Sequence, residues 1–212
     1  MLKQEAMARI RQGVARFQNE IYPTQKELFE RLRRGQQPLA LFLTCADSRV
    51  NPNLVTCTDP GEIFIERNPG NMVPPYVEFV GGVTAGVEYA MLVLKVPVIV
   101  ICGHTDCGVM KALLQPQQVE GMPGVQHWMG HGMEARDRMQ RDVGTASEDE
   151  RLRRITEYNV LSQIEHLKTH PSVRARLLHG EIDIRGWVYG IGDGSIREAD
   201  PQTGEFAPLL GK

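Results

Sequence analysis

The beginning of the chain carries a helical pattern of hydrophobic positions. Between residues 7 and 21, apolar side chains recur at alternating spacings of three and four, which predicts an amphipathic helix. Pro23 ends this pattern, and Thr24 with Glu27 forms a capping box for a second helix. Two short helices ahead of the first strand have little room in its core. We therefore expect residues 1–34 to form an arm that packs on another subunit or folds back on its own domain.

A different pattern begins after the arm. Short apolar runs rich in branched residues span residues 39–43, 63–65 and 98–101, and such runs are typical of buried parallel strands. Before the third run, residues 81–96 place apolar side chains on one face of a helix. Strands and helices that alternate in this order predict an α/β fold, with a mostly parallel central sheet flanked by helices.

The last third of the chain continues this alternation. A long helix is expected from about residue 148 to 168, where apolar residues recur with helical spacing. Residues 182–189 then alternate as a late strand, and a glycine-rich turn leads to residues 195–198, which completes a predicted edge hairpin. The sequence has no repeat, low-complexity tract or obvious linker, so we expect residues 1–212 to form a single domain that includes the arm.

Composition and charge narrow the class of protein. Hydrophobic residues make up 42% and charged residues 24% of the 212 positions, which fits a globular protein with a sizeable core. The net charge of −2 and the aromatic content of 6% predict no nucleic-acid partner. Because the sequence has no long apolar run and no apolar leader, we expect no membrane partner and a cytoplasmic location.

The four cysteines are too few for a disulfide scaffold in a chain of this length. In a reducing compartment, cysteines serve instead as core residues, metal ligands or nucleophiles. We expect Cys57 and Cys102 to pack as small core residues, because neither belongs to a ligand pattern. Cys45 and Cys107 stand in polar or glycine-rich settings and are the candidates for chemistry.

Two short motifs, each directly after a predicted buried strand, carry these two cysteines. They read CADSR at residues 45–49 and GHTDCG at residues 103–108. The carboxyl ends of parallel strands lie at one edge of a sheet, so we expect Cys45, His104 and Cys107 to meet there. Cys107 falls in the first turn of the predicted following helix, where the positive helix end favours a thiolate. One imidazole and two thiolates suit zinc.

Three protein ligands leave a fourth position on a tetrahedral zinc ion. Asp47 is the candidate for that position, and Arg49 can instead hold its carboxylate in a bidentate pair. We therefore expect Asp47 to gate the metal, closing the site when it binds zinc and opening it when it binds Arg49. The alternatives are a permanently closed structural zinc site, a redox pair of the two cysteines, and a second metal pair of His127 and His131.

These motifs resemble the β-class carbonic anhydrases. The segments that carry the resemblance occur in one order, mainly over residues 35–115, and read CADSRV, GEIFIERNPGN, VEYAMLVLKV and ICGHTDCGVMKALL. The resemblance implies a zinc ion on the three ligands named above and a catalytic dyad of Asp47 and Arg49. It also implies that the N-terminal helices embrace the partner subunit in a homodimer or a dimer-based higher oligomer.

Within this family the chain is more similar to the plant-type subgroup. Gln36, Phe64 and Tyr89 occupy the positions that line the carbon dioxide pocket in that subgroup. The other subgroup places a tryptophan just before the first cysteine and uses it in an inhibitory bicarbonate site, whereas residues 41–44 contain none. Plant-type members can carry a proton-transfer histidine where this chain has Val93.

The activity implied by the resemblance is the reversible hydration of carbon dioxide to bicarbonate. Zinc lowers the pKa of a bound water and so supplies hydroxide. Asp47, oriented by Arg49, is expected to aim this hydroxide at the small-molecule substrate. Two other functions use the same residues: a zinc-stabilised scaffold with a closed site, and hydrolysis of a related small molecule such as carbon disulfide. The arginine beside Asp47 favours an enzyme, because a scaffold does not need it.

Overall fold

The computed structural model describes residues 2–77 and 81–211. The chain separates into two units, Met1–Gln37 and Pro38–Lys212. The first unit contains the predicted helical arm, and the second contains the predicted sheet and both chemical motifs. Among the described residues, no helix combines the length and the apolar character that crossing a membrane requires.

The N-terminal unit is helical almost throughout. Its consecutive helical segments are α1 (Lys3–Arg16), a π-helical turn (Phe17–Ile21), α2 (Tyr22–Thr24) and α3 (Lys26–Leu32). Both predicted helices are therefore confirmed. Around the π-helical turn the rings of Phe17, Tyr22 and Phe29 pack together, with centroids 5.0 to 6.0 Å apart. The apolar stripe of α1, by contrast, is exposed, including Met7 and Ile10.

Two details of this unit differ from the prediction. Pro23 does not end the first helical stretch, because the backbone stays helical through Thr24. The π-helical turn before it alters the hydrogen-bond ladder, which lets a helix accommodate a residue without an N–H group. Thr24 does not cap α3 either. Its hydroxyl donates to the carbonyl oxygen of Ile21 at 2.7 Å, and Gln25 occupies the N-cap position.

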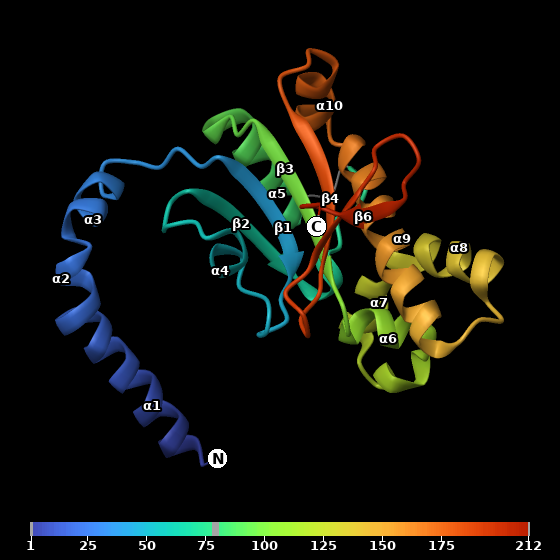
Figure 1. Ribbon diagram of the computed structural model, residues 1–212, viewed down its shortest axis with the longest axis horizontal. Helices are drawn as coiled ribbons and strands as arrows, with labels where there is room; N and C mark the ends of the chain where they lie inside the picture. Colours follow the sequence, from blue (N-terminus) through green and yellow to red (C-terminus); the bar gives the residue numbers. More distant parts are fainter. Residues whose placement is uncertain (1, 78–80, 212) are drawn as a thin grey trace. The chain divides into compact units, whose positions relative to one another are not determined.

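Strands of the second unit form one six-stranded sheet, in the order β2-β1-β3-β4-β5-β6 (Figure 1). These strands are β1 (Ala40–Cys45), β2 (Ile63–Asn68), β3 (Val98–His104), β4 (Asp183–Tyr189), β5 (Ile196–Ala199) and β6 (Phe206–Pro208). Strands β1 to β4 are parallel, whereas β5 and β6 pair in antiparallel fashion. This confirms the mostly parallel α/β sheet and the hairpin of β4 and β5. The hairpin is not at the edge, because the short β6 was not predicted and takes that position.

Helices pack around this sheet. They are α4 (Pro52–Thr56), α5 (Gly82–Tyr89), α6 (Gly108–Leu114), α7 (Pro123–Met129), α8 (Met133–Val143), α9 (Glu148–Lys168) and α10 (Pro171–Leu178). The predicted long helix is α9, and Ser147 caps its first turn. The helix predicted over residues 81–96 is α5, continued by a π-helical turn, Ala90–Leu94. The sequence pattern did not predict α7, in and after which glycines interrupt the apolar spacing, and it did not predict α8.

Both faces of the sheet are covered, which explains the continuous apolar runs. In β1, Leu41 and Leu43 are fully buried on one face, and Phe42 is buried on the other. Successive side chains of a strand point to opposite faces, so a strand covered on both sides is apolar at every position. Burial of each such side chain contributes about 1.5–3 kcal/mol.

The two cysteines outside the motifs behave differently. Cys102 is buried in β3 as predicted, and burial raises the pKa of its thiol to about 12. The prediction for Cys57 was wrong, because this residue is exposed. It ends α4 in the left-handed conformation, with φ at 51°, so it turns the chain rather than filling the core.

Candidate metal centre

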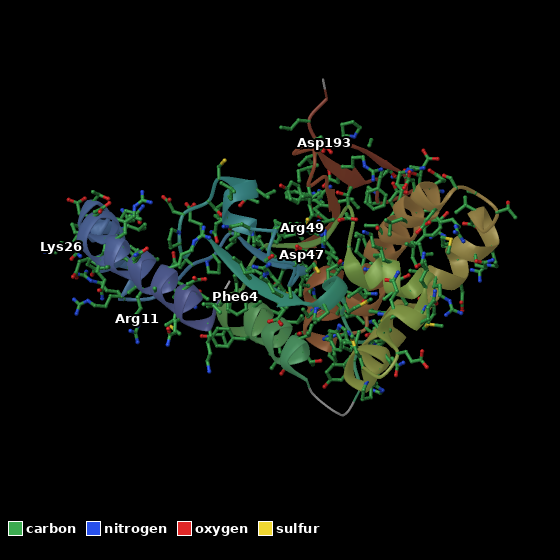
Figure 2. All side chains as sticks on the ribbon, turned by 90° about the horizontal axis from the view of Figure 1, so that it is seen from below. Arg11, Lys26, Asp47, Arg49, Phe64 and Asp193 are labelled. Atoms are coloured by element: carbon green, nitrogen blue, oxygen red, sulfur yellow. The ribbon has the colours of Figure 1, made fainter. Side chains whose placement is uncertain are left out.

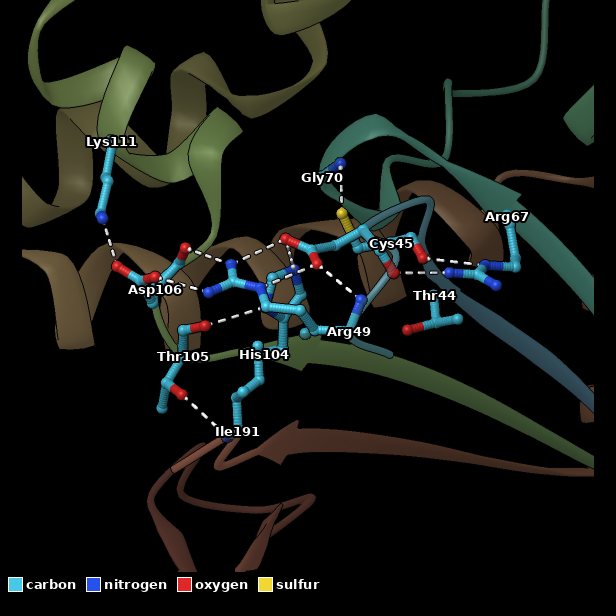
Figure 3. A network of polar contacts seen from close by, with 12 residues as sticks. Thr44, Cys45, Arg49, Arg67, Gly70, His104, Thr105, Asp106, Lys111 and Ile191 are labelled. Atoms are coloured by element: carbon cyan, nitrogen blue, oxygen red, sulfur yellow. Dashed lines mark hydrogen bonds and ion pairs between the residues drawn. The ribbon is translucent and has the colours of Figure 1, made fainter. Parts of the chain in front are cut away.

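The two strand-end motifs meet at the carboxyl edge of the sheet (Figure 3). Cys45 ends β1, His104 ends the neighbouring β3, and Cys107 is the N-cap residue of α6, just before the first turn in which it was predicted. Their sulfur and imidazole nitrogen atoms lie within 4.8 Å of one another. Elsewhere in the described part of the chain no three His, Cys, Asp or Glu side chains converge in this way, so a metal on His127 and His131 would lack a third ligand.

His104 is fully buried and keeps one ring nitrogen free for a ligand. Its Nδ1 lies 2.8 Å from the carbonyl oxygen of Thr105, and a carbonyl only accepts hydrogen bonds, so Nδ1 carries the proton. Nε2 is then unprotonated, and it is buried without a hydrogen-bond partner. Such a nitrogen is costly unless a metal binds it. A carbonyl behind the other ring nitrogen is the usual support of a metal-binding imidazole.

The two thiols complete the donor set. A hydrogen bond from the Cys107 thiol is the main influence that lowers the pKa of Cys45 to about 4, and the Gly70 N–H, 3.3 Å from Sγ, acts in the same direction. The contact with Cys45, together with burial, raises the pKa of Cys107. These opposite shifts favour the thiolate at Cys45 and the proton on Cys107, and a divalent metal would displace that proton. A neutral imidazole with two thiolates fits zinc.

Residues outside the two motifs support Cys45 from the loop after β2. Gly70 lies in the left-handed region, with φ at 76°, and a Cβ there would come within 2.9 Å of Val109. Asn159 of α9 donates to the Gly70 carbonyl at 3.0 Å, and Trp128 of α7 donates to the preceding carbonyl at 2.8 Å. The sequence marks a turn here with Pro and Gly, but it does not show that this turn meets Cys45.

Asp47 and Arg49 form a bidentate ion pair beside the ligands. Arg49 donates from Nε to Oδ1 at 3.0 Å and from Nη2 to Oδ2 at 2.8 Å, and its backbone N–H donates to Oδ1 at 2.9 Å. These hydrogen bonds hold the pKa of Asp47 well below its usual range. Oδ2 of Asp47 lies 3.9 Å from Nε2 of His104. The carboxylate is thus next to the donor set but bound to Arg49.

The loop that carries Asp47 and Arg49 makes further contacts that were not predicted from the sequence. Arg67 of β2 donates from Nε to the carbonyl oxygen of Cys45 at 3.1 Å and from Nη2 to that of Asp47 at 2.7 Å. It therefore fixes the backbone that carries both side chains. Arg49 also reaches Asp106, whose Oδ2 accepts from Nη1 at 2.8 Å (Figure 3).

A cavity of about 320 Å³ opens beside Cys45 and Asp47. The rest of its lining is mostly apolar and comprises Ala46, Pro69, Gly108, Val109, Ala112, Val119 and Val125. An apolar wall next to a charged dyad suits a small uncharged molecule. A larger cavity of about 620 Å³ reaches Asp106 from the side of α9, but none of the three ligands lines it.

Phe64 and Tyr89, two of the three residues predicted for the substrate pocket, do not line this cavity. Phe64 and Tyr89 contact each other, with ring centroids 5.9 Å apart. Phe64 pairs with Leu41, four residues before Cys45, so it lies about 13 Å along the sheet from the ligands. Phe64 and the dyad are labelled in Figure 2. Gln36 belongs to the N-terminal unit.

Fold and site together define a class: α/β proteins with a mononuclear zinc centre at the carboxyl edge of a mostly parallel sheet. Comparison with known proteins then gives the family. The family model described as carbonic anhydrase matches residues 40–196. A carbonic anhydrase of Pseudomonas aeruginosa is 44% identical over 197 residues, which cover 93% of this chain and 89% of the relative.

Solved structures agree with this match. The β-carbonic anhydrase CcaA superposes with a TM-score of 0.94 at 33% identity, over 98% of this chain and 94% of that one. One of two tetrameric β-carbonic anhydrases from Sordaria macrospora superposes with a TM-score of 0.82 at 28% identity, over 92% and 96%. The chain belongs to the β-carbonic anhydrase family. It is a carbonate dehydratase, a lyase, and zinc is its metal.

Proposed function

We propose that this enzyme hydrates carbon dioxide with Asp47 and Arg49 as a dyad that orients the attacking oxygen and gates the metal. The position of Asp47 carries the proposal. Its carboxylate accepts three hydrogen bonds from Arg49 and lies 3.9 Å from Nε2 of His104. A structural zinc site has no use for a carboxylate that is held beside its ligands by an arginine.

Each member of the dyad has its own task. When bound, zinc acts as a Lewis acid that lowers the pKa of a coordinated water and so provides a nucleophile. Asp47, ionised by its contact with Arg49, accepts a hydrogen bond from the nucleophile and fixes its direction. Arg49 keeps Asp47 from turning onto the ligand group. The apolar wall beside Cys45, which includes Val109, holds the uncharged substrate in reach.

Stopped-flow hydration of carbon dioxide by zinc-loaded protein tests the proposal. We expect hydration that rises in proportion to the zinc content of the sample, and turnover of carbon disulfide that is absent or slower on the same sample. The metal-free protein is the control. Preferential turnover of carbon disulfide would replace the proposed substrate. Full zinc occupancy without either activity would favour a scaffold.

We further propose that Gln36, Phe64 and Tyr89 line the substrate pocket of a second copy of the chain. Three observations support this. Neither Phe64 nor Tyr89 lines the cavity beside the ligands of its own chain. Tyr89 is exposed, as are the apolar Leu92 and Val93 that follow it. A matched relative from Sordaria macrospora is described as tetrameric. The plant-type assignment that names these three residues stays a prediction.

Deletion of residues 1–22 is expected to shift the protein to smaller species in analytical ultracentrifugation. This is because Met7, Ile10 and Val14 form an exposed apolar stripe, which we propose covers a partner subunit in a homodimer or higher oligomer. Arg11→Ala, a change at an exposed polar position of the same helix, is the matched control and should leave assembly unchanged. An unaltered assembly after the deletion would show that the arm does not hold subunits together.

We also propose a cytoplasmic location. Cys45 and Cys107 must stay reduced to bind zinc, and all four cysteines of the chain are free thiols. The reducing cytoplasm maintains that state.

A further inference from the structure

Arg49 is held from two sides by two acidic side chains (Figure 3). On the side of β1 it donates to Asp47 from Nε and Nη2, at 3.0 and 2.8 Å. On the side of α6 it donates from Nη1 to Oδ2 of Asp106 at 2.8 Å and from Nη2 to the Asp106 carbonyl oxygen at 3.1 Å. Four of the five guanidinium N–H groups therefore have partners, although the side chain is 44% exposed.

The carboxylate of Asp106 is itself held by a second partner, Lys111. Lys111 pairs through Nζ with Oδ1, the carboxylate oxygen that Arg49 does not use. Lys111 lies in α6, and its backbone N–H donates to the carbonyl oxygen of Cys107 at 3.0 Å. The backbone of Asp106 is left-handed, with φ at 62°, and presents both its carbonyl and its carboxylate to Arg49. This anchor therefore belongs to the segment that carries the third zinc ligand.

We propose that Asp106 is a positioning residue, which anchors Arg49 to the α6 side of the site while Lys111 balances its charge. The proposal rests on the proposed function of Asp47 and Arg49. Asp47 and Arg49 lie two positions apart in one loop. Arg67 holds the backbone of this loop at Cys45 and Asp47, but the two side chains, if bonded only to each other, would be free to swing together. Asp106 ties this pair to the segment of Cys107.

The charges of the four side chains that contact one another support a positioning role for Asp106. Lys111, Asp106, Arg49 and Asp47 alternate in sign, and each contacts the next. A second carboxylate next to Arg49 would by itself compete with Asp47 for the guanidinium. Lys111 offsets that charge, so Asp106 holds Arg49 in place without drawing it away from Asp47.

Asp106→Gly tests the anchor with the least strain, because glycine adopts the left-handed conformation without cost. It removes the carboxylate and keeps the carbonyl. We expect unchanged zinc content and a kcat lowered on the order of 10-fold to 100-fold, since a displacement of about 1 Å in a positioned group has effects of this size. Asp106→Asn tolerates the same backbone and keeps an oxygen for Nη1, so kcat should recover to within about fivefold of the wild type.

Two measurements separate positioning from a merely structural role. The double variant Arg49→Ala with Asp106→Gly should be no slower than Arg49→Ala alone, because the anchor acts only through Arg49. In crystal structures of the zinc-loaded proteins, the Asp47–Arg49 pair should be shifted relative to Cys107 in Asp106→Gly and in place in Asp106→Asn. Lys111→Met should lower kcat, whereas Lys168→Met, the matched control, removes a partly exposed helical lysine paired with Glu165 and should not.

The proposal is overturned if Asp106→Gly keeps kcat within about twofold of the wild type. It is equally overturned if the losses of the two single variants multiply, if the Asp47–Arg49 pair keeps its position relative to Cys107 in the crystal of Asp106→Gly, or if Asp106→Asn is as slow as Asp106→Gly. If wild-type protein with full zinc does not hydrate carbon dioxide, the proposed function fails. The crystal structures still decide in that case whether Asp106 positions Arg49.

Discussion

Replacing His104 by alanine is expected to remove most of the bound zinc and all measurable hydration of carbon dioxide. His104 supplies the nitrogen of the donor set, and its Nε2 is buried without a protein partner. Loss of a contact that merely supports a ligand costs about 10–100-fold in metal affinity, so loss of the ligand itself should cost more. Atomic absorption gives the zinc content, and stopped-flow indicator assays give the hydration rate.

His179→Ala is the matched control for this experiment. His179 is exposed and follows α10, outside the metal centre, so its replacement should leave zinc content and activity unchanged. Full zinc occupancy in His104→Ala would contradict the assignment of the metal centre, and His127 and His131 would then be the next residues to replace.

Arg49→Ala is expected to keep zinc and to lower kcat by roughly 100-fold to 1,000-fold, the range seen when one preorganised polar group of an active site is removed. The defect would not come from protonation of Asp47, because an ordinary aspartate has a pKa of about 3.9 and is ionised at neutral pH. It would come from a carboxylate that is free to turn toward the ligands, from which its Oδ2 is only 3.9 Å away. Steady-state kinetics and zinc analysis on one preparation measure both effects.

Two companion variants sharpen the result. Arg49→Lys keeps the positive charge but loses the two-pronged contact with Asp47, so it should restore only a small part of the activity. Arg174→Ala, at an exposed position of α10, should behave as the wild type. An Arg49→Ala enzyme with wild-type kcat would rule out the dyad, and one without zinc would show that Arg49 serves to build the metal centre.

The sheet and the ligands could be predicted from the sequence because each depends on a short, strong signal. Strands β1 and β3 are buried on both faces, so they appear as continuous apolar runs. Cys45 and His104 each end such a run, and the parallel arrangement brings the two ends together. Strand β6, which has three residues and no such pattern, gave no signal that could have found it.

The parts that could not be predicted depend on contacts between distant segments. Gly70 donates to Cys45 and Asn159 holds Gly70, yet these residues are far apart in the sequence. Asp106 lies within the recognised motif, but its role depends on a left-handed backbone that turns both its oxygens to Arg49. Local patterns carry no information of this kind. The resemblance to the carbonic anhydrase family identified Phe64 as a pocket residue. It did not show that Phe64 lies far from the metal ligands of its own chain.

Because of the strand order, the stability of the folded enzyme depends on the supply of zinc. Cys45 and His104 are 59 positions apart, and β1 and β3 must pair before the two can share an ion. Of the three ligands, only His104 and Cys107 are close together in the unfolded chain, so binding by all three requires the folded state. Free zinc at 100 times its Kd then adds about 2.7 kcal/mol to the free energy of unfolding. A cell that runs short of zinc would lose enzyme molecules to unfolding and proteolysis as well as turnover.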